Sequence, residues 1–222
     1  MFRSSTAPSD TRRASWSTST TSLVGRSKRR RRRRVDDGSD GECSGNDDDD
    51  KLLRRDGRVI YFYCDVSRAN VATLAVLLRE ACSVPTPAFG SNEVTLFIHS
   101  DGGDAYAGIS GMQHIHRCRV PVTTVADGFC ASAATLLLLG GATRKITPYT
   151  DVLIHQLSTA FWGKYQELRD EMANSTALMQ SMREIYRKHT KLSDKKLQKY
   201  LDSELYMTCD ECIKNQVVHS MF

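Results

Sequence analysis

The chain has 222 residues and a formal net charge of +5, and the excess charge lies entirely in its first 55 residues. Residues 1–35 hold eleven bases and one acid, residues 36–50 hold eight acids and no base, and residues 56–222 carry 17 of each. The net positive charge of the chain therefore gives no reason to expect nucleic-acid binding by the folded part. No apolar run approaches the roughly 18 residues that a membrane-spanning helix needs, so we expect no membrane partner.

The first 55 residues combine many charges with few large apolar side chains. Such a segment buries too little surface to offset the entropy lost on ordering, so we predict that residues 1–55 are a disordered tail or are removed. The Ser/Thr- and Arg-rich basic half is similar to an organelle transit peptide, whereas the run Arg29–Arg34 equally fits a nuclear-localisation or polyanion-binding segment. These alternatives place the protein in a mitochondrion or plastid, or in the cytoplasm or nucleus.

Seven cysteines, an odd number, are scattered along the chain. This pattern indicates free thiols in a reducing, intracellular compartment. Cys209 and Cys212 form a CxxC motif, but without a second such pair the motif is a weak signal for zinc. We therefore expect neither a metal nor another cofactor.

Strand and helix patterns alternate from Arg58 onward, and we assign residues 56–222 to one folded domain. Ser67 is placed to cap the first helix, because serine oxygens accept hydrogen bonds from free amides at helix starts. Three alternations with short connections are typical of a parallel α/β core with right-handed crossovers. The predicted strands are 58–64, 93–100, 120–128, a strand or strand pair over 144–156, and 205–208; the predicted helices lie within 67–82, 101–118, 131–141 and 165–186, with one more after Ser193.

The helix over residues 165–186 carries a single apolar stripe. Apolar side chains recur at positions 165, 168, 172, 179, 182 and 186, which follows the helical period of 3.6 residues. We expect this long amphipathic helix to project beyond the core and to pack on something else, such as another subunit.

Three groups of residues, each directly after a predicted strand, are candidates for a binding or catalytic role. Gly102 and Gly103 allow a tight turn and present bare N–H groups that suit a phosphate or an oxyanion. Ser132 stands between a strand and a helix, where it is either a side-chain cap or a nucleophile at the positive end of the helix dipole. His155 ends an apolar strand, either as a structural residue or as the base that a serine nucleophile needs.

Together these groups resemble the proteolytic subunit of the Clp protease, a self-compartmentalised serine peptidase. Residues 100–103 (SDGG) match the family's SPGG, residues 128–132 (GFCAS) match GxxAS, and residues 153–156 (LIHQ) match its hydrophobic-IHQ motif. The long helix after the histidine matches the family's handle helix. The resemblance covers about residues 58–221.

The resemblance implies an α/β fold of the crotonase-like type, with a ββα superhelical core and a projecting handle helix. The chain's closing residues match the family's GLVDxI, with Asn215 in place of the glycine. We expect a left-handed backbone at this position, because asparagine tolerates that conformation.

The resemblance also implies a catalytic triad with a nucleophile at Ser132 and a base at His155. The family's aspartate aligns with Glu204, and Asp202 is the nearest alternative acid. A glutamate can orient an imidazole, as in other serine hydrolases, although its longer arm needs a shifted backbone.

By the same resemblance, the backbone N–H groups of Gly103 and Ala133 would bind the oxyanion. Asp101 replaces the proline of SPGG and would place a negative charge beside that site, which could weaken it.

The implied activity is that of a serine endopeptidase that cleaves unfolded polypeptides inside stacked heptameric rings. The rings, homomeric or mixed, would be fed by a separate ATP-driven unfoldase of the AAA+ class. One alternative is a catalytically silent ring subunit that assembles with active relatives. Another is an acyl-CoA-binding protein of the crotonase type, which would need neither the serine nor the histidine.

Overall fold

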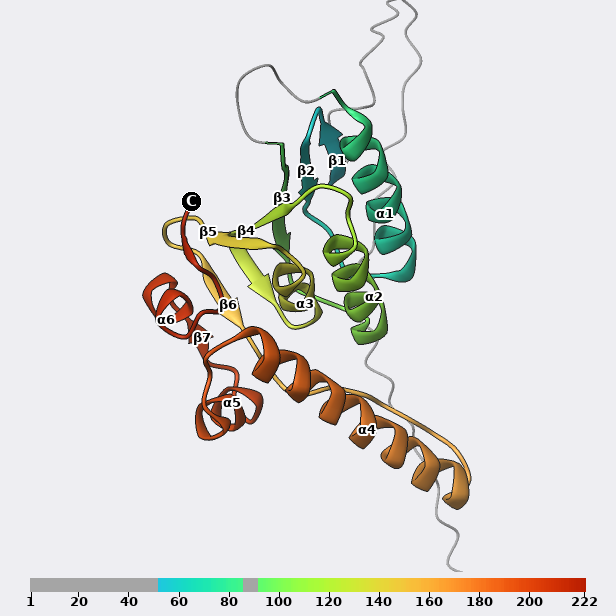
Figure 1. Cartoon of the computed structure of the whole chain (residues 1–222). Helices are drawn as coiled ribbons and strands as arrows, with labels where there is room; N and C mark the ends of the chain where they lie inside the picture. Colours follow the sequence, from blue (N-terminus) through green and yellow to red (C-terminus); the bar gives the residue numbers. More distant parts are fainter. Residues whose placement is uncertain (1–51, 86–91) are drawn as a thin grey trace, which may run out of the picture. The chain divides into compact units, whose positions relative to one another are not determined.

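In the computed structural model, the described residues are 52–85 and 92–222, so the predictions for residues 1–51 lie outside them. Within the described ranges, eight strands form one sheet, and six of them run in the order β1-β2-β3-β4-β5-β8 (Figure 1). β6 joins the sheet by pairing with β4, and β7 pairs with β6. The strands are β1 Leu53–Asp56, β2 Val59–Phe62, β3 Val94–Ser100, β4 Val122–Ala131, β5 Thr143–Ile146, β6 Asp151–Leu153, β7 Tyr206–Met207 and β8 Ser220–Met221.

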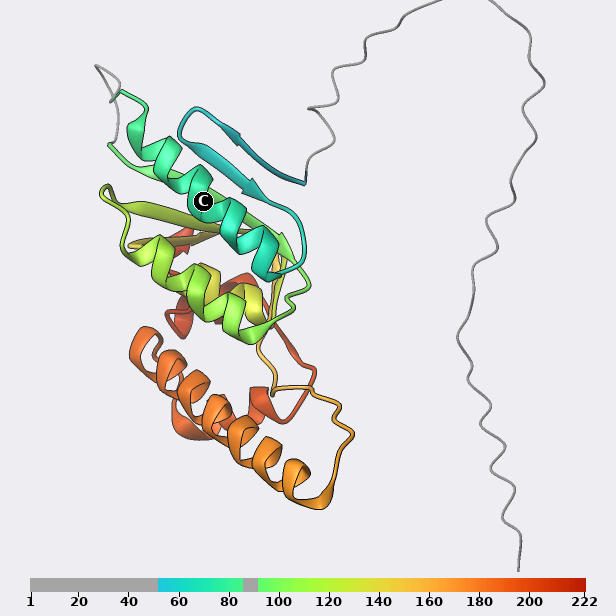
Figure 2. The ribbon, with the colours of Figure 1, turned by 90° about the vertical axis from the view of Figure 1, so that its right-hand side faces the viewer.

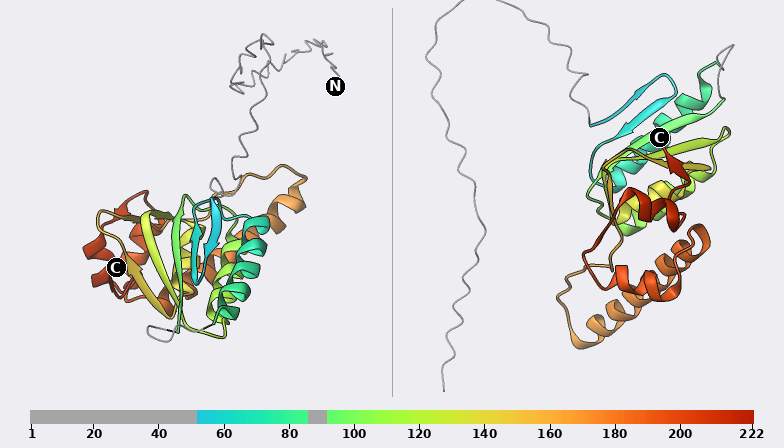
Figure 3. Two further views of the ribbon diagram at one scale, coloured as in Figure 1. Left: turned by 90° about the horizontal axis from the view of Figure 1, so that it is seen from above. Right: turned by 90° about the vertical axis from the view of Figure 1, so that its left-hand side faces the viewer.

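The core of this sheet is parallel. The neighbours β2, β3, β4 and β5 run in the same direction, and only the β1–β2 and β6–β7 pairs are antiparallel among the described strands. Helices α1 (Arg68–Ser83) and α2 (Ala105–His116) lie side by side on one face of the sheet (Figure 2 and Figure 3). The predicted α/β class with a parallel core is therefore confirmed.

The helices of the core begin where their sequences provide a capping oxygen. Ser67 Oγ accepts a hydrogen bond from the N–H of Asn70 at 3.1 Å, which confirms the cap predicted for α1. Asp104 caps α2 in the same way. Helix α3 (Ala133–Leu139) is buried at every position, which explains its four consecutive leucines, because it has no solvent face.

Strand β4 is longer than predicted and changes partner halfway along. Its residues Thr123–Ala126 pair with β5, whereas Phe129–Ala131 pair with β6. The change occurs at Gly128, whose φ of 73° is unfavourable for other residues and where a Cβ would lie 2.9 Å from His99 Nδ1. This bend carries the chain from the parallel core to Ser132.

The C-terminal part consists of α4 (Tyr165–His189), α5 (Asp194–Leu201), α6 (Cys209–Lys214) and the two short strands β7 and β8. Helix α4 projects beyond the sheet, as predicted (Figure 1). The buried guanidinium of Arg144 on β5 donates hydrogen bonds to the carbonyls of His189, Gln216 and Val217, at 2.8 to 2.9 Å. No helix in the described ranges is long and apolar enough to cross a lipid bilayer.

The start of the domain differs from the prediction. Residues 53–55, assigned to the tail, belong to β1 and pair with β2. Their bases are engaged within the domain, since Arg55 Nε lies 3.3 Å from Glu80 and the Arg54 guanidinium lies over the Tyr61 ring. The predicted boundary at residue 56 therefore leaves out residues that pair with the sheet, because the bases of β1 were counted as part of a charged tail.

Two details near the C-terminus also differ. The prediction of a left-handed backbone at Asn215 is wrong, because its φ is −92° and the following residue, Gln216, takes the left-handed value of 53°. Asn215 instead ends α6, a short helix that the sequence patterns did not predict. The carbonyl of Glu211 accepts hydrogen bonds from the backbone and side-chain N–H groups of Asn215, which fixes this residue in the helical turn.

Candidate active site

Ser132 lies at the junction of β4 and α3, in a backbone conformation that is rare for a residue with a side chain. Its φ is 53° and its ψ is −125°, and its side chain makes no capping hydrogen bond although it occupies the N-cap position of α3. Its backbone N–H donates to the carbonyl of Leu153 at 2.8 Å. A serine that only caps a helix has a relaxed backbone, and its hydroxyl oxygen accepts a hydrogen bond from an N–H of the first turn. The observed strain and a hydroxyl that does not cap the helix are typical of a nucleophile on a sharp strand-to-helix turn.

The glycine turn at residues 102 and 103 lies directly against Ser132. A Cβ added to Gly102 would stand 2.7 Å from Ser132 Cβ and 3.0 Å from the backbone nitrogen of Ala133, so only glycine allows this approach. The sequence showed the two glycines, but not that the first is required by its contact with the serine.

Two backbone N–H groups adjoin this contact, those of Gly103 and Ala133. Val66 bridges Gly103 through hydrogen bonds that use the Gly102 carbonyl and the Asp104 N–H. Within the described residues, neither the Gly103 N–H nor the Ala133 N–H donates to a protein acceptor. Ala133 is the first residue of α3, where helical amides have no partner within the helix. These unpaired amides can donate hydrogen bonds to an oxyanion.

His155 is held at the same end of the sheet by strand pairing. β4 and β6 are parallel with Ala131 opposite Leu153, so the chain after each strand emerges on the same side. The His155 Nδ1 lies 3.2 Å from Glu204 Oε1. The histidine side chain is 22% exposed, and that of the glutamate is 72% exposed. With a carboxylate at Nδ1, the favoured neutral tautomer carries its proton there and leaves Nε2 free to act as a base.

The pairing of β6 with β7 selects Glu204 over Asp202 as the partner of His155. Leu153 is paired with Tyr206 in this antiparallel ladder, and continuing the register by two residues places Glu204 opposite His155. Asp202 accepts hydrogen bonds from Gln198 Nε2 at 2.7 Å through both of its oxygens.

Within the described part of the chain, no hydrogen bond joins Ser132 Oγ to His155. The structure therefore brings together the histidine, the glutamate, the serine backbone and the two amides, but it leaves the serine–imidazole hydrogen bond unmade. Catalytic hydrogen bonds of this kind are often loose before substrate binds.

Asp101, predicted to disturb the oxyanion site, has an exposed side chain. It lines a shallow cavity with Asp65, Arg68 and Asp104. Because the carboxylate is exposed, water weakens its field at the amides of the neighbouring turn.

A cavity of about 320 Å³ adjoins the glycine turn. Gly103 and Asp104 line one side, Leu157 and Ser158 the side that follows His155, and Leu178 of α4 another. Its position between an unpaired amide and the histidine segment makes it the candidate site for a substrate side chain.

The CxxC motif, a weak zinc signal in the sequence, joins a half-buried Cys209 to a buried Cys212. Among residues 52–85 and 92–222, no group of three or more His, Cys, Asp or Glu side chains could hold a metal ion. Cys212 is buried, and burial raises the pKa of its thiol as well as that of Cys209, so both thiols stay protonated at neutral pH.

Comparisons with known proteins bear on the family and the fold of this chain. The model of the family described as "Clp protease" matches residues 67–221. A curated relative, the ATP-dependent Clp protease proteolytic subunit of Deinococcus radiodurans, is 29% identical over 124 residues, which is 55% of this chain and 61% of the relative. A solved structure of a ClpP1 mutant from Listeria monocytogenes shares the fold, with a TM-score of 0.65 and 21% identity over 75% of this chain and 91% of that one.

Proposed function

We propose that this chain, which belongs to the Clp protease family, is a serine endopeptidase. Ser132 Oγ would attack the carbonyl carbon of a peptide bond while His155 Nε2 accepts its proton. Glu204 would hold the imidazole through Nδ1 and stabilise the imidazolium that forms. The N–H groups of Gly103 and Ala133 would donate hydrogen bonds to the oxyanion of the tetrahedral intermediate.

The second half of the reaction uses the same groups. The imidazolium would pass its proton to the leaving amine, which gives an acyl-enzyme at Ser132. Water, activated by His155, would then hydrolyse the ester and regenerate the serine. No step requires a metal or an organic cofactor.

The observation that carries this proposal is the strained Ser132 beside two amides that have no acceptor within residues 52–85 and 92–222. Strain of this kind costs on the order of 1–3 kcal/mol and persists where function requires it. A structural cap would not need it, and an acyl-CoA site would need the amides but not a strained serine near a histidine–carboxylate pair.

We also propose that the chain assembles into stacked heptameric rings that receive unfolded polypeptides from an AAA+ unfoldase. The family membership and the exposed apolar part of α4 support this assembly. The six cysteines in the described ranges are all free, which supports a reducing compartment. The targeting role proposed for the basic tail, toward an organelle or the nucleus, rests on its composition.

Two observations favour the alternative of a silent ring subunit. The hydrogen bond between Ser132 Oγ and His155 is absent in the described residues, and Glu204 is largely exposed. A solvated carboxylate orients an imidazole less firmly than a buried one. A silent subunit would keep the fold and the ring contacts without reacting.

Labelling of the assembled full-length protein with a fluorophosphonate probe tests these alternatives. We expect labelling of the wild type, none of Ser132→Ala, and at least about tenfold slower labelling of Glu204→Gln. Asp202→Asn is the matched control and should label like the wild type. An assembled wild type that stays unlabelled would contradict the peptidase proposal and favour the silent subunit.

A further inference from the structure

A chain of two buried hydroxyl groups connects helix α4 to the backbone of Ser132. Thr135 Oγ1 donates a hydrogen bond to the Ser132 carbonyl oxygen at 2.6 Å. The Tyr186 hydroxyl lies 2.6 Å from the same threonine oxygen, although the two residues are 51 positions apart. Both side chains belong to fully buried residues, so water does not compete for these contacts.

The direction of the protons in this chain follows from its chemistry. The Ser132 carbonyl can only accept, so the single Thr135 hydroxyl proton points to it. Tyr186 must then donate its own proton to Thr135 Oγ1. Burial raises the pKa of Tyr186, which keeps this hydroxyl protonated over the working range of an enzyme.

The contact with the Ser132 carbonyl has a consequence for the following amide. The Ser132 C=O and the Ala133 N–H belong to one planar trans peptide unit and point in opposite directions. Any contact that fixes the direction of the carbonyl therefore fixes the direction of the N–H. The Ala133 N–H is one of the two unpaired amides beside Ser132.

This peptide unit needs to be held, because Ser132 is strained. The Ser132 N–H, in the preceding peptide unit, donates to the Leu153 carbonyl at 2.8 Å, and the Ser132 carbonyl also accepts from the Thr135 N–H at 3.0 Å. The hydroxyl of Thr135 adds a second, shorter hydrogen bond to that carbonyl. A strained conformation persists only when its surroundings fix it from several sides.

We propose that Thr135 and Tyr186 are positioning residues that aim the Ala133 N–H at the oxyanion. Neither residue touches the substrate, and both act through the Ser132–Ala133 peptide unit. Because Tyr186 lies on α4, this contact also makes the geometry of the oxyanion site depend on the seating of α4 against the core. The inference rests on the proposed function and adds two residues to its machinery.

Kinetics of Thr135→Val and Tyr186→Phe, on a fluorogenic peptide and the assembled full chain, test the proposal. Each variant removes one hydroxyl and keeps the shape of the side chain. We expect kcat to fall about 3- to 10-fold with KM unchanged, less than the 100-fold or more that loss of an oxyanion donor itself costs. Thr135→Ser, which keeps the hydroxyl, should restore kcat, and the double variant should be no slower than Thr135→Val, because Tyr186 acts through Thr135.

Thr124→Val is the matched control. Thr124 is fully buried and donates to the Leu138 carbonyl at the other end of α3, at 2.7 Å. If Thr135→Val and Tyr186→Phe lower kcat no more than this control does, or if KM rises instead, the positioning role is wrong.

Hydrogen exchange separates failure of this inference from failure of the proposed function. Amide exchange of a peptide covering residues 131–137 should accelerate in Thr135→Val and Tyr186→Phe, and not in Thr124→Val. This readout does not need an active enzyme. An inactive wild type with accelerated exchange in both variants would contradict only the peptidase proposal, and unchanged exchange would contradict the positioning role.

Discussion

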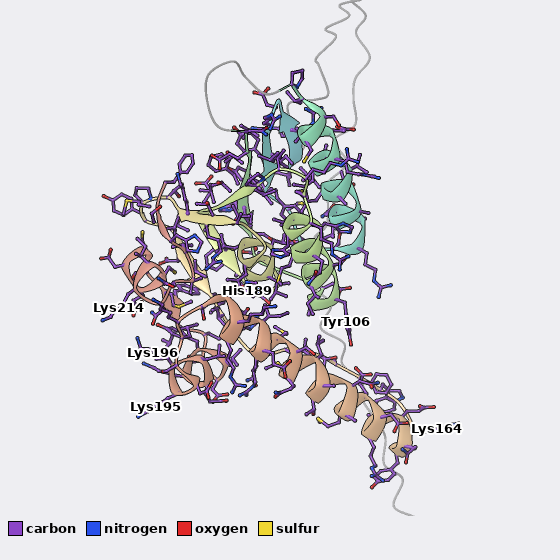
Figure 4. All side chains as sticks on the ribbon, viewed as in Figure 1. Tyr106, Lys164, His189, Lys195, Lys196 and Lys214 are labelled. Carbon is purple, nitrogen blue, oxygen red and sulfur yellow. The ribbon has the colours of Figure 1, made fainter. Side chains whose placement is uncertain are left out.

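The two halves of helix α4 share one apolar stripe but lie in different environments. Figure 4 shows Lys164 at the far end of the projecting half and His189 at the end that meets the core. In the projecting half, Met172 is 69% exposed, whereas Met182 in the other half is 3% exposed. The same helical period thus produces a buried face in one half and an open apolar face in the other, and only the surrounding chain makes the difference.

The buried half of α4 also contributes to the candidate site. The Leu157 N–H, two residues after His155, donates to Met179 Sδ at 3.1 Å, and Tyr186 reaches Thr135. Among the described residues the projecting half makes no hydrogen bond to the site, although its Glu171, Asn174 and Ser175 line the cavity beside the glycine turn. Its Tyr165, Leu168 and Met172 are exposed and are the surface that we expect another subunit to cover.

Truncation of one methionine in each half gives the largest expected effect. Met182→Ala should lower the free energy of unfolding by about 2–4 kcal/mol, because it leaves a cavity in the core. Met172→Ala should change it by less than about 0.5 kcal/mol, because an exposed side chain loses little on truncation. Chemical denaturation at low protein concentration measures both. If both substitutions lower the free energy of unfolding equally, the two halves of α4 are buried to the same extent and the comparison is wrong.

Polar substitution of the projecting half should act on assembly instead of folding. We expect Leu168→Ser combined with Met172→Ser to weaken self-association by about 10- to 100-fold, because exposed apolar residues supply the contact area. Sedimentation velocity over a concentration series measures this change. Val76→Ser, at another exposed apolar residue outside α4, should leave association unchanged. Unaltered association of the double variant would show that this face is not an interface.

Acidification should destabilise the end of α4 that packs against the core. Its effect on the free energy of unfolding is the smallest that we expect. Burial, followed by the charge of Arg144, lowers the pKa of both His189 and His219 below the usual 6.5. Below pH 6.5 the unfolded chain binds protons that the folded chain does not, so stability is lost as the pH falls from 6.5 through the folded pKa values. His219 Nδ1 also accepts a hydrogen bond from the Arg144 N–H, which protonation would break.

We expect this loss to stay below about 1 kcal/mol, because solvent screens the exposed His219. Melting temperatures measured between about pH 7 and pH 5 should fall less steeply in His219→Asn than in the wild type. His114→Asn, at an exposed histidine on α2, is the control and should keep the wild-type slope. Parallel slopes in all three proteins would exclude His219 as a contributor.

Local sequence patterns predicted the strands and helices whose side chains repeat with a regular strand or helix period. The alternation of strands and helices, the Ser67 cap and the stripe on α4 were all predicted, because each depends on residues within a few positions of one another. Strand β1 was missed for the opposite reason. Its bases resemble those of the tail until their partners, such as Glu80 on α1, are known.

The sequence predicted the motifs of the candidate site but not the contacts between residues that lie far apart in the chain. The sequence could name Ser132 and His155 through their motifs and left two acids as candidates for the third position. The register of β6 and β7 places Glu204 beside His155. The link from Thr135 to Tyr186 had no sequence signal, because it joins two helices 51 positions apart.

The sequence by itself therefore determined the family, the parallel α/β core and the amphipathic α4, because these follow from local periodicity and short motifs. The tertiary structure decided which carboxylate meets His155, which half of α4 is buried, and which amides beside Ser132 find no acceptor in the described part of the chain. The reason is physical: a backbone period is set by neighbouring residues, whereas register and burial depend on segments that meet only when the chain has folded.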